Sequence, residues 1–211
     1  MSALSLAPRA LYEEVAELLR QRIFARELEA GSWIDELRIA QALGISRTPL
    51  REALKVLAAE GLVTMKVRRG AYVTEVSEKD LRDVYHLLSL LESDAARVVA
   101  SCATDEQMTQ IQVLQTALEA AMNDRDRFFE LNENFHMLLL GIADNRWRDQ
   151  MVADLRKVMK LNRHNSLFKS GRLEESLKEH QAIMDALMAR DAALTVQRMN
   201  EHFANGLEAA S

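Results

Sequence analysis

The sequence predicts a mainly α protein built from two parts. The first, residues 1–76, combines three helices with two short strands, and the second, residues 77–211, is an all-α antiparallel helical bundle. Both prolines and four of the seven glycines lie in the first 70 residues, and the remaining chain is rich in good helix formers. Charge divides at the same place. Residues 44–70 hold six basic and two acidic side chains, whereas residues 77–211 hold 16 basic and 22 acidic ones, so we expect different partners for the two parts.

Composition narrows the class of protein. A chain of 211 residues with 48% hydrophobic residues can bury a core. Its longest apolar run, near residues 137–143, is shorter than the roughly 20 residues of a membrane-spanning helix, and residues 1–8 lack the apolar stretch of a signal peptide. Cys102 stands alone, which excludes an internal disulfide and a cysteine-based zinc finger. We therefore expect a cytoplasmic protein without membrane contact, and a Cys102 thiol buried among its apolar neighbours.

The first part has the order of elements of a winged helix-turn-helix domain. Periodicity predicts helices over residues 11–26, 36–43 and 46–60, followed by strands over 62–67 and 71–76. Gly44 supplies the turn between the second and third helices, and Ser46 can cap the third. Pro49 is tolerated because amides in the first helical turn have no acceptor to lose. The Arg68-Arg69-Gly70 turn between the strands would form the wing.

The third helix has two contrasting faces. Basic residues recur every four positions on one face and leucines occupy the other: Arg47, Arg51 and Lys55 against Leu50, Leu54 and Leu57. An arginine near the start of such a helix can bind guanine O6 and N7 in the major groove, while other cations neutralise phosphates. The spacing alone also fits an ordinary solvated helix face. The order of helix, turn, basic helix and basic hairpin favours DNA binding, with the wing along or in the minor groove.

The second part is predicted to hold six helices, near residues 78–102, 105–123, 126–143, 145–165, 172–190 and 192–208. Ser77, with Asp80 three residues later, is typical of a helix start. Within this part Asn132 and His136 lie one helical turn apart on a shared face, and His180 and His202 lie on or beside apolar stripes. Three converging imidazoles would hold zinc, nickel or manganese with a position open to water or an acid. From the spacing alone, core histidines that are half-exposed or satisfied by hydrogen bonds are the simpler explanation.

Five segments of the first part resemble the N-terminal domain of GntR-family bacterial transcription regulators. They are residues 11–12, 30–31, 43–54, 60–63 and 69–73, and the run 43–54 is the most specific. The resemblance implies operator binding by Arg47, Thr48 and Arg51 on the recognition helix, with the wing tip assisting. A position that is often basic in the family holds Leu37. The residues that we expect to contact DNA are Arg38, Arg47, Thr48, Arg51, Lys66, Arg68, Arg69 and Gly70.

The second part resembles the all-helical FCD effector domain of the FadR subfamily. The resemblance rests on Asn132 to His136, Glu179-His180, Glu201-His202 and Asn145. It implies a divalent metal held by Asn132, His136, His180 and His202. Many members have aspartate at the first of these positions. A neutral asparagine leaves the charge of the metal uncompensated, which strengthens attraction for a carboxylate and weakens metal retention.

The same resemblance implies a small organic acid as effector. Family members often anchor the effector carboxylate with an arginine on the first helix of the domain, and Leu88 occupies that position here. His86, Arg97 or Arg163 could replace it, although each also fits a surface or core-edge position.

The function expected from these patterns is a homodimeric transcription regulator, most simply a repressor, since two half-sites multiply the specificity of a small DNA-binding module. A di-iron enzyme would need two Glu-x-x-His motifs, and only Glu133 to His136 fits. Gly-rich phosphate loops and recognisable nucleophile motifs are absent from the sequence. An alternative retains DNA binding and makes the bundle a plain dimerisation module without metal or effector.

Overall fold

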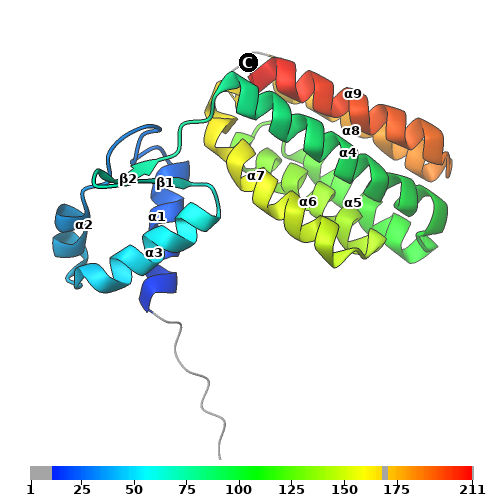
Figure 1. Ribbon diagram of the computed structural model, residues 1–211. Helices are drawn as coiled ribbons and strands as arrows, with labels where there is room; N and C mark the ends of the chain where they lie inside the picture. The colour runs from blue at the N-terminus through cyan, green and yellow to red at the C-terminus, as the bar shows by residue number, and fades with distance from the viewer. Residues whose placement is uncertain (1–10, 168–170, 211) are drawn as a thin grey trace, which may run out of the picture. The chain divides into compact units, whose positions relative to one another are not determined.

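The computed structural model describes residues 11–167 and 171–210, and within the first range the side chains of residues 162–167 are not described. The chain forms two compact units that divide between Val76 and Ser77 (Figure 1). We call them the N-terminal and C-terminal units and describe each by itself. Among the described residues, no helix is long and apolar enough to span a membrane.

The N-terminal unit has the predicted order of elements. Its elements are α1 (Leu11–Phe24), α2 (Glu36–Leu43), α3 (Arg47–Ala59), β1 (Val63–Lys66) and β2 (Gly70–Val73). Asp35 caps α2 by accepting hydrogen bonds from the amides of Leu37 and Arg38. Gly44 ends α2 in the left-handed conformation, with φ of 65°, as expected of a turn residue. Ser46 occupies the N-cap position of α3 but makes no side-chain capping bond.

Helices α1 and α3 pack against each other and form the core of this unit. The buried side chains are Val15, Leu19 and Ile23 of α1 and Leu50, Leu54 and Leu57 of α3. Arg20 of α1 donates two hydrogen bonds, of 2.9 and 2.8 Å, to the Glu60 carboxylate just beyond α3. Because the leucines of α3 face this core, the basic side chains on the opposite side of the helix face solvent.

A two-stranded antiparallel hairpin completes the unit. Val63 pairs with Val73 at one end of the hairpin and Lys66 with Gly70 at the other, so both strands are shorter than predicted. Gly70 has φ of 90°, and a Cβ at this position would lie 3.1 Å from Trp33 Nε1. Glycine is therefore required twice, by the backbone conformation and by the close approach of Trp33.

The C-terminal unit is the predicted helical bundle. Its helices are α4 (Glu78–Cys102), α5 (Asp105–Ala120), α6 (Arg125–Ala143), α7 (Arg146–Leu167), α8 (Arg172–Met188) and α9 (Ala192–Ala210). Ser77 and Asp80 form a reciprocal capping box at the start of α4. Helix α4 packs against α6, α7, α8 and α9, which makes it the central element (Figure 1).

The prediction of a buried Cys102 thiol is wrong. Cys102 is the last residue of α4 and its side chain is exposed. Val99 and Ala100 turn inward from the same end of the helix. Apolar neighbours in sequence did not predict burial here, because a helix distributes consecutive residues over different faces.

Candidate functional site

Three histidines from three different helices meet in the core of the C-terminal unit. His136 of α6, His180 of α8 and His202 of α9 are all buried. One nitrogen from each ring lies within 4.8 Å of the corresponding nitrogens of the other two. The ring centroids are 4.8 to 5.3 Å apart. Bundle packing thus brings together side chains that are far apart in the sequence.

A buried carboxylate holds the first of these rings. Glu92 Oε2 lies 2.7 Å from His136 Nδ1, and the Glu92 carboxylate accepts bonds of 2.8 and 2.6 Å from the Arg156 guanidinium. Burial alone would raise the pKa of Glu92, but the charges of Arg156 and His136 outweigh it and lower the pKa to about 2. Burial and the charge of Arg156 lower the pKa of His136 to about 4, despite the opposing effect of Glu92. His136 is therefore neutral at pH 7, and its Nδ1 lies against the Glu92 carboxylate without a completed hydrogen bond among the described residues.

A second carboxylate holds His202 in the same manner. Glu179 Oε2 lies 2.7 Å from His202 Nδ1, and the Glu179 carboxylate also accepts hydrogen bonds from Arg172, at 2.8 and 3.0 Å, and from Asn205 Nδ2 at 3.0 Å. Burial would raise the pKa of Glu179, but the hydrogen bonds from His202 and Arg172 outweigh it and lower the pKa to about 2. Two rings of the cluster are thus oriented by carboxylates that arginines hold in turn, an arrangement typical of histidines around metals.

The third ring and a nearby amide lack such partners. Both ring nitrogens of His180 and the side-chain oxygen of Asn132 are buried without a hydrogen-bond partner among the described residues. Burial, followed by the neighbouring His202 and His136, lowers the pKa of His180 well below its usual value, so this ring is also neutral. Buried polar atoms in proteins nearly always have a partner. His180 and Asn132 therefore offer lone pairs that no hydrogen bond among the described residues takes up.

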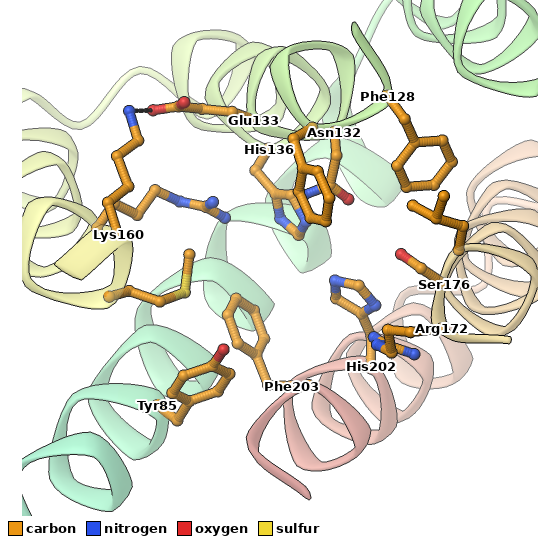
Figure 2. Close-up of a pocket in the computed structure, with 15 residues that line it drawn as sticks. Tyr85, Phe128, Asn132, Glu133, His136, Lys160, Arg172, Ser176, His202 and Phe203 are labelled. Carbon is orange, nitrogen blue, oxygen red and sulfur yellow. Dashed lines mark ion pairs between the residues drawn. The ribbon is translucent and has the colours of Figure 1, made fainter. Parts of the chain in front are cut away.

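A cavity of about 100 Å³ opens beside the cluster. Figure 2 shows His136 and Asn132 of α6 and His202 of α9 on its wall. Its apolar lining consists of Tyr85, Phe128, Phe129, Met159, Leu173 and Phe203. Arg156, Arg172 and Lys160 also line it. Each of these cations is bonded to a carboxylate of the chain, and Lys160 Nζ lies 2.6 Å from Glu133 Oε1.

Two of the three residues expected to anchor an effector, His86 and Arg97, are not among the described residues that line this cavity. His86 and Arg97 are exposed on α4, and Arg97 bonds to Asp94 at 2.8 Å. Leu88 is fully buried. The face of α4 that carries Leu88 and Glu92 turns into the core and therefore leaves His86 and Arg97 outside. The side chain of the third candidate, Arg163, lies outside the described residues.

The residues that sequence reasoning missed are the two carboxylates and their arginines. Glu92 and Arg156 form an ion pair across 64 residues of sequence, whereas Arg172 and Glu179 lie seven residues apart on α8. A charged residue within an otherwise apolar helix face was the available signal for Glu92, and for Glu179 it was the position beside His180.

Cations predicted to contact DNA are exposed in the N-terminal unit. Arg47 and Thr48 are exposed at the start of α3. Arg51 Nε donates a 2.7 Å hydrogen bond to Glu36, yet its side chain remains 56% exposed. On the hairpin Arg68 and Arg69 are exposed, as are Lys66, whose Nζ lies 4.3 Å from the centre of the Tyr72 ring, and Arg38 of α2. Gly70 is half-buried at the hairpin turn.

Comparison with known proteins assigns both units. Residues 11–73 match the family described as bacterial regulatory proteins, gntR family, and residues 83–205 match the FCD domain. The HTH-type transcriptional repressor RspR of Escherichia coli strain K12 is 29% identical over 192 residues, which cover 90% of this chain and 84% of RspR. The Nta operon transcriptional regulator of Aminobacter aminovorans is 30% identical over 183 residues, or 84% of this chain and 86% of that protein.

Solved structures show the same fold. The structure described as E. coli McbR/YncC superimposes with a TM-score of 0.79 at 20% identity, and the match covers 96% of this chain and 98% of that one. The predicted fold class and family resemblance are both confirmed. The chain belongs to the GntR family of bacterial regulatory proteins and is a DNA-binding transcription regulator with an FCD domain.

Proposed function

We propose that this regulator is a homodimeric repressor that acts in the cytoplasm and whose FCD domain senses a small organic acid through a bound divalent metal. Two copies of α3 would read an inverted-repeat operator in successive major grooves, with Arg47, Thr48 and Arg51 at base edges and phosphates. Arg38 and the wing residues Lys66, Arg68, Arg69 and Gly70 would add contacts to the DNA. Relatives with the repressor name, among them RspR and the gluconate operon repressor of Bacillus subtilis, support the sign of regulation.

The unpartnered buried atoms of His180 and Asn132 support the metal most strongly. Neutral imidazole and amide oxygen are ligands that zinc, nickel and manganese accept. His136 and His202 complete the set, with their rings oriented by Glu92 and Glu179. When bound, the ion would supply a Lewis-acidic centre with an open position. Because Arg156 and Arg172 already balance the two carboxylates, the surroundings would leave the ion's positive charge uncancelled, which favours an anionic ligand.

The size and lining of the cavity support a small effector. An apolar cavity of about 150 Å³ can hold benzene, so about 100 Å³ accommodates a body of only a few carbon atoms. Tyr85, Phe128 and Phe203 would contact that body. Lys160, Arg156 and Arg172 are each paired within the chain, so the effector carboxylate would bind at the histidine cluster. Such a ligand changes DNA affinity only through its difference in affinity for DNA-competent and DNA-incompetent states.

Metal analysis of protein purified without a histidine tag tests the proposal. We expect a divalent metal in stoichiometric amount in the wild type and its loss in His180→Ala. The matched control is His86→Ala, which removes an exposed histidine outside the cavity. If metal-incubated wild type holds no ion, and His136→Ala leaves thermal stability and DNA affinity unchanged, the bundle is a dimerisation module alone.

The effector is tested by a thermal-shift screen of small carboxylic acids, with and without a chelator. We expect a hit that raises the melting temperature only when the metal is present. The same acid should release the protein from an operator selected from random DNA, measured by fluorescence anisotropy. A stabilising acid that binds equally well in the presence of chelator would contradict the metal's role.

A further inference from the structure

The C-terminal unit exposes large apolar side chains on two neighbouring helices. Leu87 and Leu90 of α4 are 43% and 55% exposed, and Trp147 and Met151 of α7 are 69% and 53% exposed. The two helices pack together. Arg148 of α7, which directly follows Trp147, reaches Asp94 of α4 with a 3.2 Å hydrogen bond. Exposed apolar side chains on neighbouring helices, with Trp and Met among them, are typical of interaction sites.

Charges on α4 are arranged symmetrically about Leu90. Asp83, His86, Asp94 and Arg97 are all exposed, and their spacing puts them on one face of the helix with Leu90. His86 and Asp94 stand four residues on either side of Leu90, and Asp83 and Arg97 stand seven residues on either side. An acidic residue on one side is thus matched by a basic or titratable residue at the same distance on the other.

This arrangement is complementary to itself under a two-fold rotation. If two α4 helices cross antiparallel at Leu90, Asp83 faces Arg97 of the partner subunit, and His86 faces Asp94 of the partner subunit. An isologous dimer interface requires such reciprocal contacts, whereas an unrelated partner would place no such constraint on the face. At 25 residues α4 is about 37 Å long, long enough for both pairs of charges on each side of the axis.

We propose that this face is the dimer interface between two copies of the chain. We call it the α4–α7 face and define it by Asp83, His86, Leu87, Leu90, Asp94, Arg97, Trp147 and Met151. The inference rests on the proposed homodimer and names the surface that forms it. Asp94 and Arg97 are bonded within the chain at present, as are Asp83 and Lys79. These pairs are exposed, so exchanging them for partners across the interface costs little. Asp94 can keep the hydrogen bond that its Oδ2 accepts from the buried Arg148 while its Oδ1 changes partner.

The test is the dissociation constant of the full-length dimer, measured by sedimentation velocity. Leu90→Glu would place two carboxylates face to face at the two-fold axis and should raise the dissociation constant by about 100-fold or more. Val113→Glu is the matched control, because Val113 is 65% exposed on α5, outside the face, and it should leave the constant unchanged. Circular dichroism melting establishes that both variants are folded.

Charge reversal tests the antiparallel register. Arg97→Glu sets like charges against Asp83 of the partner subunit and should weaken the dimer, while Asp83→Arg combined with Arg97→Glu should restore it. A wild type that dimerises together with an unaffected Leu90→Glu variant would overturn the interface and leave the proposed homodimer intact. A wild type that is monomeric at every concentration, also on operator DNA, would overturn both and leave the face to another partner. If the double variant dimerises as weakly as Arg97→Glu alone, the antiparallel register is overturned.

Discussion

Replacement of Glu92 by glutamine tests the buried network that supports the histidine cluster. The Glu92 side chain is 2% exposed and Arg156 is 3% exposed, so neither charge can turn to water when its partner is lost. Glutamine keeps the size of the side chain but removes its charge and turns an amide donor toward Arg156. The variant thus leaves a buried guanidinium without its counter-ion.

The size of the effect follows from this burial. Removing one partner of a buried ion pair costs about 3–5 kcal/mol. In a protein of this length each kcal/mol lowers the melting temperature by about 2–4 °C, so the melting temperature of Glu92→Gln should fall by about 6–20 °C. Glu92 also orients His136, and loss of such a partner lowers metal affinity by about 10- to 100-fold.

Thermal melting of metal-free protein and metal titration measure the two effects separately. Glu130→Gln, which breaks an exposed pair with Arg127 on α6, is the control and should melt close to the wild type. Glu92→Met combined with Arg156→Met should regain stability because both charges are gone, but not metal affinity. A Glu92→Gln variant that melts like Glu130→Gln and binds metal normally would refute the assignment of Glu92.

Three further predictions concern DNA, the wing and pH. Arg47→Ala should weaken specific operator binding by about 1–3 kcal/mol, whereas Arg22→Ala, a surface change on α1, should not; equal affinities in an anisotropy titration would contradict the recognition assignment. Gly70→Ala should destabilise the hairpin by about 1–3 kcal/mol, because φ of 90° is strained for alanine and its Cβ would meet Trp33. An unchanged melting temperature and an unchanged DNA affinity would contradict the requirement for glycine at this turn. The fold lowers the pKa of His136. As the pH falls below about 6.5, His136 therefore takes up a proton in the unfolded chain while it stays neutral in the folded chain. Metal-free protein should therefore lose stability from about pH 6.5 toward pH 4, and a flat profile of melting temperature over that range would contradict the buried neutral imidazole.

Much of the fold could be predicted because helix limits are local. Ser77 caps α4 through contacts three residues away, and Gly44 ends α2 through its own backbone conformation. The α4 prediction of residues 78–102 agrees with the structure at both ends. Side-chain burial near helix ends was harder, as the exposed Cys102 shows, because periodicity assigns a face only when the neighbouring helices are known.

The sequence by itself determined the order of elements, the wing, the basic and apolar faces of the recognition helix and the identity of the histidines. These features depend on hydrogen bonds and steric preferences within a few residues. Only tertiary structure decided which charges support the cluster, since Glu92 and Arg156 are 64 residues apart and meet through helix packing. It also decided that His86 and Arg97 face outward, because the side of α4 that is buried depends on the helices that cover it.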